Sequence, residues 1–411
     1  MSTDRCTREE ATEAVLALRR SLLDRIETGR VAPDRIGQRV LARAVTADRD
    51  VPRRDRATMD GFAVAAGDDA PREIRESVVG PGGEAGEHRA GTATRVATGA
   101  FLPKGADAVV PVEDAAVADG TLVGGDASPG QHVVAAGSVV AAGETVLSAG
   151  RRLAPRDAAV LRELGRDEVP VRRRLSAALL ATGTEIHAGR EPDRDSEFLA
   201  NLLRAWGGEP RLAGSVPDDP DRVGDRIAAL AEESDVVVTT GGTGVSDADE
   251  TAGALRDRAE VVVERVAMRP GSNATVARLA DESAVVASLP GVPGAAFLSA
   301  LVLLRPLFVG ETPAARVPAR LDCDLPVPEA DREFAVPVEF RRAADSGGET
   351  PRSVVPFGHP ASSVALYEGR YRPHRVASCP RLSAAEGVVF TRSDLAANDD
   401  VDVVPYDALG S

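Results

Sequence analysis

The chain has 411 residues, enough for several separate hydrophobic cores, and hydrophobic residues make up 43% of it. Its net charge of −15 and its aromatic content of only 3% argue against nucleic acids and anionic membranes as partners. The sequence contains neither a long apolar run nor a recognisable leader, so we expect a cytoplasmic protein.

Basic residues are almost all arginines, and Lys104 is the only lysine. An acidic chain of this kind is typical of a salt-adapted cytoplasm, although a GC-rich genome would produce the same arginine bias. The three cysteines and five histidines are scattered through the sequence. Their spacing predicts neither a disulfide framework nor a His/Cys metal site.

The first third of the chain predicts a helix followed by a small β domain. Thr7 to Glu10 has the form of a capping box, and the apolar residues after it recur at helical spacing as far as Gly29. Asp60 belongs to an Asp-Gly pair between apolar residues, which is first of all a turn. Residues 64–134 alternate in short, glycine-punctuated runs typical of a β domain. Thr98 ends one of these runs, and its presence there is equally explained by the preference of β-branched residues for strands.

Strands and helices then alternate over residues 172–308, which predicts a doubly wound, mostly parallel sheet. Glu185, Asp218, Asp249 and Pro290 all lie in loops that follow predicted strands. Because parallel strands end at one edge, we expect these loops to gather where such folds bind ligands.

One of these strands, at 236–240, ends at Gly241-Gly242-Thr243-Gly244. Bare backbone N–H groups at such a turn, followed by a helix, would suit a phosphate. The acidic residues that follow, Asp249 among them, suggest that a divalent cation accompanies the phosphate. A tight turn followed by a helix N-cap would have the same sequence.

We therefore expect a multidomain protein that combines α/β and β domains. The expected parts are an N-terminal helical and extended domain (1–47 and 138–171), an inserted β domain (48–137), the α/β domain (172–310) and a C-terminal β-barrel-like domain (311–411).

Together these stretches resemble the molybdopterin molybdenumtransferase family, which includes the E domain of gephyrin. The resemblance runs from the first helix to about residue 310. The matching motifs, in order, are Thr58-Met59-Asp60-Gly61-Phe62-Ala63, residues 98–113, Thr182-Gly183-Thr184-Glu185, Asp218-Asp219-Pro220, the loop 241–249, Met268-Arg269-Pro270-Gly271 and Leu289-Pro290-Gly291-Val292-Pro293.

The resemblance implies a homodimer that inserts molybdate, or tungstate, into adenylylated molybdopterin with Mg²⁺-dependent release of AMP. It makes residues 1–47 and 138–171 an elongated linker and dimerisation domain. It implies a central domain with the molybdopterin-binding fold and a molybdopterin adenylyltransferase as a candidate partner. Asp60 and Thr98 would act from one protomer on the site of the other. The implied Mg²⁺ and phosphate-side ligands are Glu185, Asp218 and Asp249. The implied substrate-binding residues are Gly241, Gly242, Thr243, Gly244, Ser246, Gly271, Ser272, Pro290 and Pro293, with Arg265 and Arg269 as anion clamps.

Several positions depart from the family pattern. Thr184 stands for an aspartate, Arg265 and Arg269 for lysines, Ser272 for a lysine and Val292 for an asparagine. The Gly-Gly-Thr-Gly loop is closer to molybdopterin adenylyltransferases. Two alternatives therefore stay open: a paralogue that binds molybdopterin or its nucleotide as a carrier or sensor, and a molybdopterin adenylyltransferase.

Overall fold

The computed structural model describes residues 5–83, 86–241, 258–280, 284–310, 315–328, 332–341 and 352–407. The chain forms two compact units. One is Thr28–Arg172, and the other combines Met1–Glu27 with Arg173–Ser411. The finer division into four domains stays a prediction. Among the described residues, no helix combines the length and the apolar content needed to cross a bilayer.

The larger unit begins with helix α1, Arg8–Arg25, and the predicted capping box is confirmed. The Glu10 N–H donates to Thr7 Oγ1 at 3.2 Å, and the Thr7 N–H donates to the Glu10 carboxylate at 2.8 Å. One face of α1 is buried, with Ala11 and Val15 fully so. This face packs against the helical segments that close the α/β domain.

The α/β domain contains a six-stranded sheet in the order β14-β13-β15-β19-β18-β16. The first four strands are parallel to one another and the last two pair antiparallel, which confirms the predicted, mostly parallel sheet. Strand bounds are β13 Ser176–Thr182, β14 Glu209–Val216, β15 Val236–Thr240, β16 Ala259–Val263, β18 Thr275–Leu279 and β19 Val285–Leu289.

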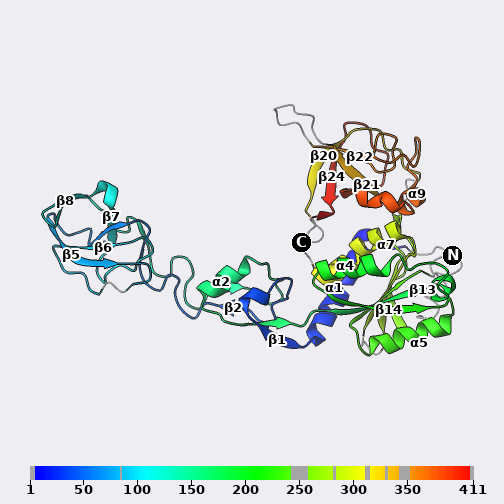
Figure 1. Cartoon of the computed structure of the whole chain (residues 1–411), viewed down its shortest axis with the longest axis horizontal. Helices are drawn as coiled ribbons and strands as arrows, with labels where there is room; N and C mark the ends of the chain where they lie inside the picture. Colours follow the sequence, from blue (N-terminus) through cyan, green and yellow to red (C-terminus); the bar gives the residue numbers. More distant parts are fainter. Residues whose placement is uncertain are drawn as a thin grey trace. The chain divides into compact units, whose positions relative to one another are not determined.

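Helices cover both faces of this sheet (Figure 1). Helix α5, Pro220–Ala231, lies on the opposite face from α4, Ser196–Ala205. The short α3, Thr184–His187, follows β13. The domain ends with a continuous helical run: α7 Pro293–Ser299, the π-helical η3 Ala300–Leu304 and α8 Arg305–Val309. The helix expected after the turn at 241–244 lies outside the described residues.

The C-terminal strands close into the expected barrel, because β23 pairs with both β24 and β21. The sheet order is β17-β21-β22-β20-β24-β23. Bounds are β17 Met268–Arg269, β20 Val317–Leu321, β21 Glu333–Arg341, β22 Ser353–Pro356, β23 Gly387–Thr391 and β24 Asp400–Pro405, with α9 Pro373–Ala377 and η4 Pro380–Ala384. Phe334, Phe357 and Tyr371 fill its core. The two-residue β17 comes from the α/β part of the chain.

The described residues of the smaller unit form three short antiparallel pairs and one larger sheet. The pairs are β1 Thr28–Val31 with β12 Val169–Arg172, β2 Val45–Thr46 with β11 Thr145–Leu147, and β3 Arg56–Ala57 with β10 Val133–Val134. The short helices η1, Pro33–Arg35, and α2, Asp157–Glu163, accompany them. Leu41, Leu153 and Leu161 form the core between these elements.

The sheet has the order β7-β4-β6-β5-β9-β8 and contains the predicted inserted β region. Its bounds are β4 Gly61–Val64, β5 Arg72–Val79, β6 Thr92–Val96, β7 Ala108–Pro111, β8 Ala116–Ala118 and β9 Thr121–Gly124, with η2 Val112–Asp114. Strand β4 lies between β6 and β7, so the two motifs of this region, around Asp60 and Thr98, meet.

Candidate functional site

The four parallel strands of the α/β sheet end at the same level. Thr182 on β13 lies opposite Val216 on β14, and Thr240 on β15 lies opposite Leu289 on β19. Ala181 pairs with Thr240 and completes the row. The loops that follow these strands carry Glu185, Asp218, Gly241 and Pro290, so the structure brings these four predicted site residues to one edge of the sheet.

Two glycines allow three of these loops to touch. Gly241 has φ +91, and a Cβ added there would lie 2.2 Å from the Thr182 carbonyl oxygen. A Cβ on Gly291 would lie 2.7 Å from the Gly241 Cα. Any larger residue at either position would push the loops apart. Pro290 is buried beside this contact, while Pro293 is exposed at the start of α7.

Thr184 and Asp218 exchange two hydrogen bonds across adjacent loops. The Thr184 N–H donates to Asp218 Oδ2 at 2.8 Å, and the Asp218 N–H donates to Thr184 Oγ1 at 3.1 Å. Both residues are exposed, as is Glu185. Asp219 instead caps α5, accepting from the Arg222 N–H at 3.0 Å. The Asp-Asp pair thus divides into one structural cap and one carboxylate at the sheet edge.

Arg265 and Arg269 lie on a segment outside the main sheet order. Arg265 follows β16, which ends at Val263. Arg269 is part of β17, which pairs with β21 of the C-terminal barrel. Both arginines are half-buried.

A tight turn follows these arginines. A Cβ on Gly271, at φ +105, would lie 2.6 Å from Ser299 Oγ on α7. The Ser272 carbonyl accepts from the Val266 N–H at 3.3 Å, and its hydroxyl donates to Asn273 Oδ1 at 3.2 Å. Position 272 therefore holds the turn and offers no cation.

Asp60 and Thr98 meet in the smaller unit. Asp60 Oδ1 accepts from the Thr98 N–H at 2.6 Å and from Thr98 Oγ1 at 2.7 Å. These two bonds lower the pKa of the exposed Asp60 carboxyl below its ordinary value. Gly61 is required beside it, since a Cβ there would lie 2.1 Å from the Val110 carbonyl oxygen. Asp60 is thus a turn residue whose carboxylate is also held by the second motif.

Gly242, Thr243, Gly244, Ser246 and Asp249 lie outside the described residues. Within the described part of the chain, no group of three His, Cys, Asp or Glu side chains is placed to hold a metal ion. Two of the three predicted ligands, Glu185 and Asp218, therefore have a described position.

Comparison with known proteins matches this arrangement to one family. The sequence model described as "MoeA N-terminal region (domain I and II)" matches residues 6–165, and "Probable molybdopterin binding domain" matches residues 178–309. The molybdopterin molybdenumtransferase of Synechococcus elongatus is 31% identical over 322 residues, covering 72% of this chain and 78% of that protein. The chain belongs to the molybdopterin molybdenumtransferase family.

Other relatives extend the match. Molybdopterin molybdenumtransferase 2 of Mycobacterium tuberculosis is 32% identical over 359 residues, covering 79% of this chain and 84% of that protein. A solved structure of the molybdopterin biosynthesis MoeA protein from Pyrococcus horikoshii has a TM-score of 0.71 and 26% identity, covering 98% of this chain and 99% of that one. A second such structure has a TM-score of 0.74 at 22% identity. The expected multidomain fold is confirmed, including the C-terminal barrel that the two sequence models do not reach.

A buried carboxylate at the same sheet edge was missed from the sequence. Asp195 precedes α4 and is 6% exposed, and its Oδ1 has no hydrogen-bond partner among the described residues. Burial, with a smaller contribution from Asp193, raises the pKa of the Asp195 carboxyl to about 6. An aspartate before a helix normally indicates an exposed N-cap, so the sequence carries no signal of its burial.

We expect Asp195→Asn to stabilise the protein more at high pH than at low pH. Because the folded pKa lies above the unfolded one, the folded state binds more protons between about pH 4 and 6, and its stability falls as pH rises through that window. The gain in unfolding free energy should be about 1–3 kcal/mol larger at about pH 8 than near pH 4. Urea unfolding at both pH values measures it, with Asp221→Asn on the exposed side of α5 as control. An equal gain at both would contradict the raised pKa.

Proposed function

We propose that the protein inserts molybdate into adenylylated molybdopterin and releases AMP, as a cytoplasmic step of molybdenum cofactor biosynthesis. The observation that carries this proposal is the reciprocal Thr184–Asp218 bond at the sheet edge, in a chain of the molybdenumtransferase family. It fixes one carboxylate next to the loop of a second, Glu185, where folds of this kind bind ligands.

The carboxylates at this edge suit Mg²⁺, which prefers oxygen ligands and binds together with phosphates. Glu185, Asp218 and Asp249 would hold the ion; both described members are exposed, and Asp218 is oriented by its bonds with Thr184. The ion would supply positive charge against the pyrophosphate during its cleavage. Arg265 and Arg269 would bind the anionic groups of the substrates, and the backbone N–H groups of the loop 241–246 would bind phosphate.

Two chains would form a homodimer in which Asp60 and Thr98 of one protomer serve the sheet edge of the other. The hydrogen bonds between these two residues support this role, because they keep the exposed Asp60 carboxylate ionised and in a fixed orientation. Adenylylated molybdopterin must come from an adenylyl-transfer reaction, so a molybdopterin adenylyltransferase is the natural partner.

Ser272 favours one rival, a carrier or sensor that binds molybdopterin or its nucleotide without converting it. The family has a lysine at this position, and here the hydroxyl is used within the turn. Loss of one charge-assisted contact lowers affinity or rate by about 10- to 150-fold, which weakens an enzyme but does not abolish it.

The assay for this proposal uses purified protein at high salt with adenylylated molybdopterin, Mg²⁺ and molybdate. A transferase releases AMP only when molybdate is present. A carrier binds the nucleotide and releases nothing, and an adenylyltransferase releases pyrophosphate when given ATP and molybdopterin.

A further inference from the structure

The segment that carries Arg265 and Arg269 is held on one side by the residue Cys6 near the N-terminus and on the other by strand β21 of the C-terminal barrel. On one side, the Cys6 N–H donates to the Arg265 carbonyl at 3.1 Å, and the Ala267 N–H donates to the Cys6 carbonyl at 2.8 Å. On the other side, the Glu333 N–H donates to the Ala267 carbonyl at 3.0 Å. Met268 and Arg269 then continue as β17 alongside β21 of the barrel.

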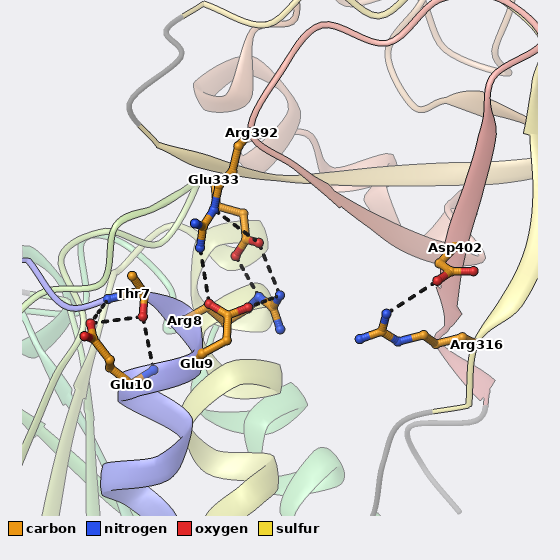
Figure 2. Close-up of polar contacts among 8 residues, drawn as sticks. All are labelled: Thr7, Arg8, Glu9, Glu10, Arg316, Glu333, Arg392 and Asp402. Atoms are coloured by element: carbon orange, nitrogen blue, oxygen red, sulfur yellow. Dashed lines mark hydrogen bonds and ion pairs between the residues drawn. The ribbon is translucent and has the colours of Figure 1, made fainter.

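The same Glu333 joins the barrel to α1 through its side chain. Its carboxylate accepts two bonds from Arg8, from Nε at 2.7 Å and from Nη2 at 3.2 Å (Figure 2). The capping box of Thr7 and Glu10 fixes the start of the helix from which Arg8 extends. The Arg8 guanidinium also lies over the Phe390 ring, 4.4 Å from its centre.

Two further residues complete a ring of alternating charges. Glu9 accepts from Arg8 at 2.7 Å and from Arg392 at 3.2 Å, and Arg392 Nε lies 4.0 Å from Glu333 Oε1. Figure 2 shows the four side chains converging between α1 and the barrel. The Glu333 side chain is 8% exposed and that of Arg8 is 23% exposed, whereas Glu9 and Arg392 are mostly exposed. Burial makes the Arg8–Glu333 pair the costly one to break.

We propose that Glu333 is a positioning residue for the anion-binding arginines. By pairing with Arg8 it holds β21 against residues 267–269, and so sets where Arg269 presents its charge to the substrate. The C-terminal barrel thereby contributes to the site through the backbone of β17. This inference rests on the proposed role of Arg265 and Arg269.

The test compares Glu333→Gln with Asp402→Asn. Asp402 forms an ion pair with Arg316 at 3.4 Å in the same barrel, also drawn in Figure 2. Among the described residues, this pair shares no hydrogen bond or ion pair with the four charged residues Arg8, Glu9, Glu333 and Arg392. We expect Glu333→Gln to raise KM for adenylylated molybdopterin about tenfold and to change kcat less than about twofold. Asp402→Asn should change neither.

Hydrogen exchange supplies a readout that does not depend on the anion-binding role of Arg269, and a double mutant supplies a second test through KM. Amides of residues 265–271 should exchange faster in Glu333→Gln and at the normal rate in Asp402→Asn. Arg8→Gln should raise KM as Glu333→Gln does. The double variant should be no worse than either single one, because it leaves no unpaired buried charge.

Arg269→Ala separates this inference from the proposed function. If Arg269→Ala raises KM while Glu333→Gln leaves both KM and exchange unchanged, Glu333 is not a positioning residue and the anion-binding role stands. If Arg269→Ala leaves KM unchanged, the anion-binding role is wrong, and with it the inference built on it.

Discussion

Replacing Asp218 by asparagine is expected to lower the rate of molybdate-dependent AMP release about a hundredfold while the fold is retained. Asparagine removes the negative charge that a Mg²⁺ ligand needs. Its amide oxygen still accepts from the Thr184 N–H, which Asp218 Oδ2 does at 2.8 Å in the native chain. The contact between the two loops should therefore survive, so the fall in the rate of AMP release reports the loss of the negative charge alone.

The neighbouring residue provides the matched control. Asp219 undergoes the same chemical change in Asp219→Asn, but asparagine caps a helix about as well as aspartate does. Its activity and Tm should stay close to those of the native protein. Activity measured against Mg²⁺ concentration adds a second readout, because a lost ligand raises the Mg²⁺ requirement. Equal activity of both variants would show that Asp218 is no ligand.

Two inactive variants are expected to restore activity when they form mixed dimers. Asp60→Asn removes the carboxylate that the smaller unit contributes, and Asp218→Asn removes one from the sheet edge. If a site combines the smaller unit of one protomer with the sheet edge of its partner, each mixed dimer has one intact site. Random association makes half of the dimers mixed, so about a quarter of the native activity should return. Coexpression with two affinity tags isolates the mixed dimers, which should then have about half of the native activity per dimer.

A second pairing controls for nonspecific rescue. Asp60→Asn and Thr98→Ala damage the same bonded pair, so their mixed dimer has no intact site and should stay inactive. If the first pairing also fails while mixed dimers form, Asp60 and Asp218 act within one chain. If no dimers form, the homodimer itself is contradicted.

The sheet edge was predictable from the sequence because it depends on local patterns. The β-branched run at 236–240 and its glycine stop predict where a buried strand ends, and four such endings align in a parallel sheet. Asp60 was a candidate only through the motif around it, since an Asp-Gly pair alone predicts a turn.

Contacts between distant residues were not predictable in the same way. Thr184 was noted as a departure from the family pattern, but its bonds to Asp218 depend on two loops meeting 34 positions apart. The two-residue β17 pairs with β21 across more than sixty positions, and a run that short has no periodicity to detect. Strand β18 was missed for a related reason. Its five residues are interrupted by the charged Arg278, and no helix precedes the strand as the predicted alternation of strands and helices requires.

Burial of polar groups is the third limit. Asp195 and Glu333 carry charge, and in the sequence charge predicts exposure. Their burial follows from how α4 packs on the sheet and how the barrel meets α1, which only the assembled chain determines.

The measurement that tests the central claim most directly is AMP release over time from adenylylated molybdopterin, with Mg²⁺ and at high salt, in the presence and absence of molybdate. Molybdate-dependent release with repeated turnover is the predicted result, and tungstate would then be tested in its place. Tight binding of the nucleotide with no AMP released under either condition would contradict the transferase and identify a binding protein instead.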